Sequence, residues 1–233
     1  MMNPPELLPT AIREGLAPGV NYRIEGELVP MLHCALDGSM PVYFEHHVVL
    51  WKDPKLAIRL RAVRGATRRM IAGREVFLTE AKGRGEIAFS RDAPGHIFPL
   101  ELPRQAAILV REHQFLAATA STRYSASRIR GISNNLFGDN GFWVDRFEAR
   151  EGDGVVWLHG YGNVLEKELE VGEEIDVEPG GWVYMDPNVR MRPTVYGLRT
   201  GIFAGVGRLV FNRLRGPGRV GIQTMFVHLP TED

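Results

Sequence analysis

The chain has 233 residues, and 44% of them are hydrophobic, which is enough to build one large domain with a substantial core. Its 28 basic and 28 acidic residues give a formal net charge of zero, so no global field draws in nucleic acid or an anionic membrane. The single cysteine, Cys34, excludes an intrachain disulfide and a thiolate metal cluster, and it fits a reducing compartment.

The first residues, MMNPPELLPTAIREGL, lack a charged leader followed by an apolar core. No stretch of the chain approaches the roughly 18 apolar residues that are typical of a membrane-spanning helix. We therefore expect a cytoplasmic protein, and the sequence leaves any membrane contact open.

Short β-type runs separated by glycine and proline turns follow one another along the chain. Examples of the runs are HIFPLEL (96–102), EEIDVE (173–178) and RVGIQT (219–224), and the turn signals include LDG, APG, EPGG and GPG. This pattern of many short strands predicts an all-β fold. Only GATRRMIAG (65–73) could hold a turn or two of helix.

Two sets of residues recur at a fixed period. Val48, Phe115 and Trp182 are spaced by 67 residues, and Gly65, Gly131 and Gly197 are spaced by 66. The first register also aligns Glu45 with Glu112 and His46 with His113. We predict a single domain of three pseudo-equivalent β units, covering approximately 22–88, 89–155 and 156–230. They would form one β-sandwich or barrel-like body with pseudo-threefold symmetry, in which Val48, Phe115 and Trp182 are equivalent buried strand residues.

Residues 216–218 (GPG) lie between two apolar runs. They hold the place that KGRGE (82–86) and REGDG (150–154) hold in the other units. A phosphate-binding loop needs a helix after its glycines, whereas the β-type run RVGIQT follows here. We therefore predict a hairpin turn with positive φ at Gly218. GIFAGVGRL (201–209) lacks the third glycine of a dinucleotide-binding loop.

A metal-dependent enzyme of cupin type is the first alternative. Glu45, His46, His47 and His113 are of the residue types that hold a divalent metal. Adjacent residues of a strand point to opposite faces, so His46 and His47 would not line one cavity without a bulge. Whether the three histidines converge is left open.

No nucleophile with a plausible base stands out in the sequence. The serines considered are Ser90, Ser121, Ser125 and Ser127. Cys34 fits a buried strand residue better than a reactive thiol. We assign no catalytic, cofactor-binding or metal residue, and we favour a binding protein over an enzyme.

A nucleic-acid-binding protein is the second alternative. Six arginines and no acid occur between Arg59 and Arg74, which could track phosphates. Aromatic residues are not interleaved with them, as stacking on single strands would require. A solvated face or a protein contact is the favoured interpretation.

Several segments resemble one protein family. GRLVFNRLRGPGRVGIQT (207–224) resembles the terminal signature of the altered-inheritance-of-mitochondria-24 family, also called the mitochondrial biogenesis family, and FEHHVVLW (44–51), REVFLTEAKGRGEIAFS (74–90) and REHQFLAAT (111–119) resemble its earlier segments. The resemblance runs from about Tyr22 to His228. It implies a fold similar to the tryptophan RNA-binding attenuation protein, three such units in one chain, often an oligomer, and no reaction. Mitochondrial relatives are linked to inner-membrane organisation, a location that we do not expect here because no transit peptide is visible.

The charge distribution suggests how copies of the chain could associate. The segment from Glu166 to Glu178 holds seven acids against Lys167, and it lies in the third unit, whereas the arginine run lies in the first. We expect a closed homo-oligomer, with a trimer favoured, in which unit three of one copy meets unit one of the next. The alternative is that the same charges meet within one chain or face water. The predicted function is an oligomeric scaffold or a binding module for an unidentified ligand.

Overall fold

The structure is a computed structural model that describes residues 6–7, 14–62, 77–128, 143–196 and 209–225. The described residues form β-strands and turns with one short 3-10 turn, η1 (His46–Val48), which confirms the all-β prediction. Within these ranges no helix is long and apolar enough to cross a membrane. The segment expected to hold a turn of helix (65–73) lies outside the described residues, as do Gly65, Gly131 and Gly197.

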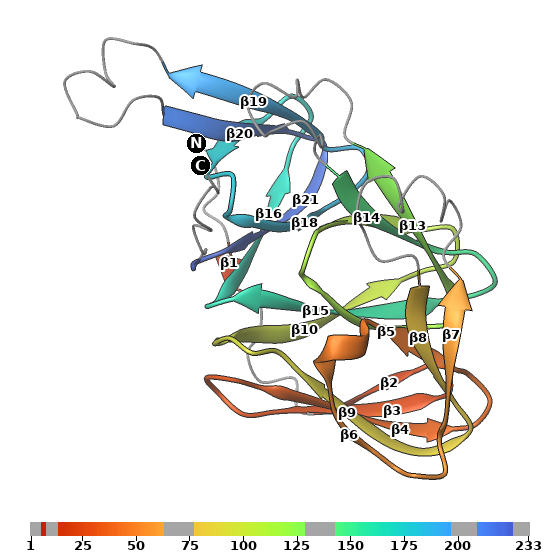
Figure 1. The fold of residues 1–233 in the computed structure, drawn as a ribbon. Helices are drawn as coiled ribbons and strands as arrows, with labels where there is room; N and C mark the ends of the chain where they lie inside the picture. Colours follow the sequence, from red (N-terminus) through yellow and green to blue (C-terminus); the bar gives the residue numbers. More distant parts are fainter. Residues whose placement is uncertain (1–5, 8–13, 63–76, 129–142, 197–208, 226–233) are drawn as a thin grey trace.

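The described strands pair antiparallel in four sheets, which follow one another from the bottom to the top of Figure 1. Sheet 1 contains, in spatial order, β2 (Glu14–Ala17), β3 (Val20–Glu25), β4 (Met31–Asp37), β9 (Arg84–Ser90) and β6 (Val49–Lys52). Sheet 2 contains β10 (Gly95–Leu102), β15 (Gly154–Tyr161), β12 (Phe115–Thr119), β5 (Val42–Phe44), β8 (Phe77–Lys82) and β7 (Ala57–Ala62).

Sheet 3 contains β1 (Glu6–Leu7), β16 (Val164–Leu169), β21 (Gly218–Gln223), β18 (Trp182–Met185), β11 (Ala107–Arg111), β14 (Trp143–Ala149) and β13 (Thr122–Arg128). Sheet 4 contains only β17 (Glu174–Val177), β20 (Leu209–Arg215) and β19 (Arg190–Tyr196).

Three buried cores lie between successive sheets. The first core joins residues of sheets 1 and 2, such as Phe89 and Trp157; the second joins sheets 2 and 3; and the third, around Trp182, joins sheets 3 and 4. Strands of the inner sheets therefore have both faces covered. In β15 every residue from Gly154 to Gly160 is buried, whereas β3 in the outer sheet alternates between buried and exposed residues.

The same order of strands recurs in the sheets. One kind of three-stranded group is β4-β9-β6, β10-β15-β12 and β16-β21-β18, and the other kind is β5-β8-β7, β11-β14-β13 and β17-β20-β19. A group of each kind joins in sheet 2, through β12 and β5, and again in sheet 3, through β18 and β11. Sheet 1 holds a group of the first kind and sheet 4 a group of the second kind, so β6 and β17 lie at sheet edges.

The turn at residues 216–218 has the predicted backbone at Gly218, where φ is +136°. The predicted hairpin is wrong, because β20 belongs to sheet 4 and β21 to sheet 3, so the turn carries the chain around a corner between two sheets. The other two glycine turns are also corners, between β8 and β9 and between β14 and β15. Alternation along a strand sets which face is buried, and it does not identify the strand that pairs with it.

The first repeat register is off by one residue. Phe115 and Trp182 begin β12 and β18, and both are fully buried. Val48 is buried too, but it ends η1, and Val49 begins β6, so the predicted strand position of Val48 is wrong. The pairing register shifts just after the first residue of each strand, between Val49 and Trp51, Phe115 and Ala117, and Trp182 and Tyr184.

A similar turn precedes each of these three strands. One i→i+3 backbone hydrogen bond closes each turn: Val48 donates to Glu45, Gln114 to Arg111, and Gly181 to Glu178. The strand begins at the next residue in all three cases. Pseudo-threefold symmetry of the whole body stays a prediction.

Candidate functional site

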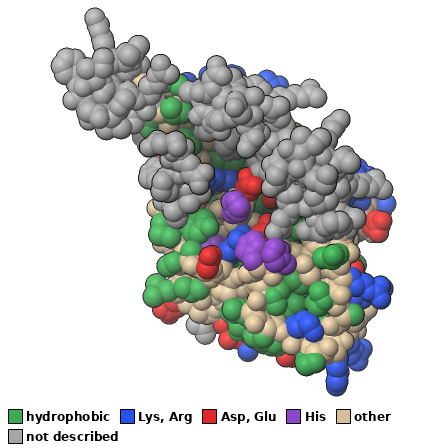
Figure 2. Space-filling model, in the orientation of Figure 1, with side chains coloured by type: hydrophobic (Ala, Val, Ile, Leu, Met, Phe, Trp, Pro, Cys, Tyr) green, Lys and Arg blue, Asp and Glu red, His purple; other side chains and the backbone are tan. Residues whose placement is uncertain are grey.

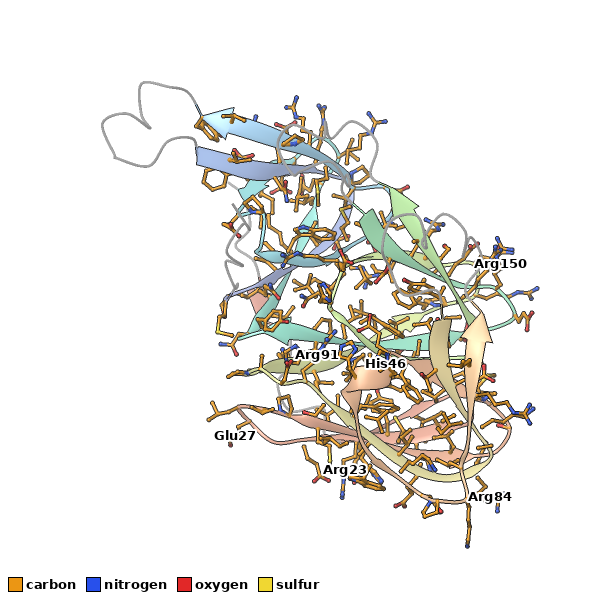
Figure 3. All side chains as sticks on the ribbon, in the orientation of Figure 1. Arg23, Glu27, His46, Arg84, Arg91 and Arg150 are labelled. Carbon is orange, nitrogen blue, oxygen red and sulfur yellow. The ribbon has the colours of Figure 1, made fainter. Side chains whose placement is uncertain are left out.

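The histidines singled out in the sequence lie beside a buried arginine. His46 and His47 belong to η1, not to a strand, so the expectation that they point to opposite faces of a strand is wrong. η1 brings them close to Arg91, which follows β9. Figure 3 places the labelled His46 and Arg91 between sheets 1 and 2, and Figure 2 shows a group of histidines with basic and acidic side chains on this face.

Arg91 is the centre of this cluster. One of its terminal nitrogens, Nη1, lies 2.8 Å from Nε2 of His47, and Nη2 lies 3.3 Å from a carboxylate oxygen of Glu45. Nη2 also donates to the backbone carbonyls of His113 and, at 3.1 Å, Phe115. Only 5% of the Arg91 side chain is exposed. The guanidinium therefore contacts the same imidazole nitrogen and carboxylate that a metal ion would need as ligands.

The residues proposed as metal ligands do not form a ligand set. His47 Nε2 lies 3.4 Å from the Glu45 carboxylate, but the rings of His46 and His47 meet edge to face with their centroids 5.6 Å apart. His113 contributes its backbone carbonyl to Arg91, and the residue is exposed, with φ at +67°. No group of three or more His, Cys, Asp or Glu side chains that could hold a metal occurs in the described residues.

Sequence reasoning missed another histidine near Arg91. His159 in β15 is fully buried and packs edge to face on Tyr161, with 5.3 Å between ring centroids. Burial, together with the nearby Arg91 cation, lowers the pKa of His159 to about 4. The ring is therefore neutral near pH 7. The only sequence signal for it was its place in the continuous apolar run GVVWLHGY.

The cluster connects separate segments of the chain. Arg91 links the end of β9 to the turn before β12, and Arg111, at the end of β11, donates to the Gly180 carbonyl at 2.6 Å in the turn before β18. Each guanidinium thus bonds the third residue of a turn that leads into a strand at a junction between groups. The arrangement favours a structural clamp over a reactive centre.

Several of the serines considered as nucleophiles, and Cys34, are hydrogen-bonded or buried within the fold. The Ser90 hydroxyl donates to the Pro30 carbonyl at 2.9 Å, and the hydroxyls of Ser121 and Thr119 lie 2.9 Å apart. Cys34 is buried in β4, as predicted, and burial raises the pKa of its thiol. Ser125 lies half-buried in β13, and the side chain of Ser127 lies outside the described residues.

Two acids of the segment 166–178 have arginine partners within the chain. Arg213 donates to both carboxylate oxygens of Asp176, at 2.6 and 2.7 Å, and these bonds lower the pKa of Asp176. Glu174 lies within ion-pair distance of three arginines, which are Arg192, Arg213 and Arg215. In the basic run, Arg61 pairs with Glu80 at 3.3 Å, and the part from residue 63 onward lies outside the described residues.

The edge strand β6 exposes large apolar side chains. Leu50 is 57% exposed and Trp51 is 43% exposed, with the Trp51 ring centroid 5.3 Å from that of His33. The edge strand β17, in sheet 4, carries the alternating sequence Glu-Ile-Asp-Val. Among the described strands, β6 pairs only with β9 and β17 pairs only with β20.

The sequence profile of the mitochondrial biogenesis AIM24 family matches residues 22–225. The chain belongs to the AIM24 family. An uncharacterized protein of Streptococcus pyogenes is similar to this AIM24 chain, with 30% identity over 164 residues. The match covers 68% of the chain and 62% of that relative, so the chain spans about three fifths of the relative's length.

A solved structure supports the fold of this AIM24 chain. The X-ray crystal structure of protein SPYM3_0169 from Streptococcus pyogenes is similar to it with a TM-score of 0.67 and 21% identity. The similarity covers 89% of this chain and 94% of the streptococcal protein. The likeness to the tryptophan RNA-binding attenuation protein stays a prediction.

Proposed function

We propose that this AIM24 chain acts by association, as a homo-oligomeric scaffold whose copies join head to tail. The observation that carries the proposal is which kinds of three-stranded group each sheet contains. Sheets 2 and 3 each combine two three-stranded groups, whereas sheet 4 is a single group and sheet 1 has a group of the first kind with β6 at its edge. The group β4-β9-β6 of sheet 1 and the group β17-β20-β19 of sheet 4 are thus the two kinds of group that the inner sheets combine.

The chain is built of three equivalent units in this proposal: β4 to β9, β10 to β15, and β16 to β21. The recurring groups, the closed turns and the register shifts support it. The unit boundaries expected at 88/89 and 155/156 fall inside β9 and β15, so the proposal moves them to the connections at 91–94 and 162–163. Each inner sheet then combines strands of two successive units.

Open edges give the units a reason to associate. An edge strand presents unpaired backbone N–H and C=O groups, which favour pairing with another strand. A contact between the last unit of one copy and the first unit of the next is heterologous, and it makes a ring if the rotation between copies closes. A trimer is the ring size that we expect.

Light scattering and native mass spectrometry of the whole chain test the proposal. We expect one defined multiple of the chain mass, three copies, at micromolar concentration. Because main-chain hydrogen bonds and apolar contacts would hold the joint, added salt should change the mass little. A single copy at micromolar concentration, in both low and high salt, would contradict the scaffold.

A further inference from the structure

We propose that β6 of one copy pairs antiparallel with β17 of the next copy, with Trp51 opposite Val177 and Lys52 opposite Asp176. The partner is thus a second copy of this chain, and the contact completes sheet 4 of one copy with sheet 1 of the next. The inference rests on the proposed scaffold and identifies the joint that holds it together.

The two junctions inside the chain fix this register. In sheet 2, Phe44 lies opposite Ala117, and in sheet 3, Val110 lies opposite Tyr184. Ala117 and Tyr184 each stand two residues after the first residue of their strand, which is Phe115 in β12 and Trp182 in β18.

The residues opposite Ala117 and Tyr184 also follow a fixed spacing along the chain. Phe44 stands five residues before Val49, the first residue of β6, and Val110 stands five residues before Phe115. By the same count Val177 stands five residues before Trp182, and Trp51 stands two residues after Val49. A third junction of this kind therefore places Trp51 opposite Val177.

Burial at the internal junctions shows what these positions do. The residues equivalent to Leu50 and Trp51 are Leu116 and Ala117 in β12, and Val183 and Tyr184 in β18. All four are fully buried. They belong to the core of the preceding unit, the first core for β12 and the second for β18.

Leu50 and Trp51 are the exposed members of this series. They are 57% and 43% exposed, although a leucine and a tryptophan are larger than most of their buried counterparts. In the proposed joint, the preceding unit is the last unit of the neighbouring copy, and its core is the third core. Val177 is already buried there, with only 7% of its surface exposed. Burying two large apolar side chains there would drive association.

The next pair along the strands carries opposite charges. The internal junctions place Tyr43 opposite Ala118 and Leu109 opposite Met185 at this position. The proposed joint has Lys52 and Asp176 instead, and opposite charges directly across an antiparallel pair stabilise it. The Lys52 ammonium now donates to the carbonyls of Asp53 and Leu56, at 3.0 and 3.2 Å, and it has a third hydrogen to donate.

These charges also select the partner. Two β17 strands would bring Glu174 and Asp176 of both copies to one interface, and two β6 strands would bring together two lysines, so self-pairing of either edge is disfavoured. β7, β13 and β19 are equivalent edge strands of sheets 2, 3 and 4. They stay at an edge even in sheets 2 and 3, where two groups are already joined, so they are not part of a junction. β10 is also an edge, but its counterparts β4 and β16 pair with β3 and β1, which lie outside the three units. Among the described strands, β6 and β17 are the edges whose counterparts pair with a strand of another unit.

A matched pair of substitutions tests the apolar contact. Leu50→Asp puts a charge where the joint needs an apolar side chain, and Leu60→Asp puts the same charge on β7, where Leu60 is 74% exposed. We expect Leu50→Asp to raise the dissociation constant of the assembly by at least about 30-fold. Leu60→Asp should leave the mass measured by light scattering unchanged.

Engineered cysteines test the register. The only native cysteine, Cys34, is buried. Residues directly opposite have Cβ atoms about 5 Å apart, so Lys52→Cys with Asp176→Cys in one chain should give covalent multimers on oxidation. Lys52→Cys with Glu174→Cys is two residues out of register and should give at least about 10-fold less cross-linking.

The outcomes separate the inference from the proposed function. If the wild type is a single copy, the scaffold proposal and this joint both fail. If the wild type assembles but Leu50→Asp assembles equally well and the 52–176 pair does not cross-link, the scaffold stands and this joint is overturned. Cross-linking of the 52–176 pair together with loss of assembly in Leu50→Asp supports the joint.

Discussion

β12 and β6 are alike at their start and differ in their surroundings. Both follow a turn closed by an i→i+3 hydrogen bond, and both shift register after their first residue. β12 has a strand on each side, and its Leu116 is fully buried, whereas β6 has one neighbour among the described strands, and its Leu50 is 57% exposed. The comparison teaches that a neighbouring strand, more than the local sequence, decides what an apolar residue contributes at this position.

Truncating the two leucines tests that comparison most directly. Leu116→Ala should lower the free energy of unfolding by about 2 to 5 kcal/mol, because it leaves a cavity in the first core. Leu50→Ala should change it by less than about 0.5 kcal/mol in single copies, where the side chain contacts mainly water. Urea unfolding at a concentration where light scattering finds single copies measures both. Equal losses would show that β6 and β12 do not differ in the proposed way.

Acid should lower the free energy of unfolding through His159, which lies in β15, the strand that pairs with β12. Its pKa is about 4 in the folded chain, against 6.5 for a free imidazole, so the unfolded chain binds the proton more readily between these values. The stabilisation is complete above about pH 6.5 and is lost as the pH falls towards 4. At about 1.4 kcal/mol per pH unit, up to about 3 kcal/mol is lost.

Unfolding curves at several pH values between 4 and 7 measure this effect. His159→Gln has no proton to bind in this range, so it should flatten the pH dependence even if it lowers stability at pH 7. An unchanged slope in His159→Gln would assign the acid sensitivity to other groups.

The arginine clamp sharpens the same comparison, because Arg91 bonds the turn before β12. Arg91→Lys should cost about 1 to 3 kcal/mol, since a compact ammonium cannot reach His47 and the carbonyls of His113 and Phe115 together, and a buried carbonyl loses its partner. Arg84→Lys is the control, because Arg84 is exposed and donates to one carbonyl, that of Asp37. Similar small losses in both variants would contradict the clamp.

The corners between sheets give the smallest expected effect. Gly218→Val should cost about 1 to 2 kcal/mol, because φ is +136° and an added Cβ would lie 3.0 Å from side-chain atoms of Asp186 and Val189. Gly152→Val is the matched change, with φ at +155° but nothing within 4 Å of the added Cβ. Melting temperatures should fall further for Gly218→Val, and equal shifts would show that crowding at this corner contributes nothing.

Local pattern was enough to predict the fold class and some of the burial. Short β-type runs with glycine turns indicated an all-β chain, and Phe115, Trp182 and Cys34 are buried in strands as expected. Gly218 has the positive φ that its turn required. Each of these features depends on a few residues near one another in sequence.

Pairing between distant segments could not be predicted in the same way. The strands on either side of residues 216–218 pair with strands of different sheets, although their sequences would suit a hairpin. The histidine cluster was misinterpreted because its central cation, Arg91, lies 44 residues from His47 and was not singled out. His46 and His47 were predicted in a strand, but they belong to the 3-10 turn η1. The following strand, β6, therefore begins at Val49, one residue after the predicted position.

The double covering of β15 has a consequence for how the protein unfolds. Trp157 belongs to the first core, while its neighbours Val156 and Leu158 belong to the second. Because successive residues of one strand serve two cores, neither core can be dismantled while the other keeps its full set of contacts. The chain should therefore melt in a single cooperative transition, with equal calorimetric and van't Hoff enthalpies, and a cut between units would expose half of a core on each fragment.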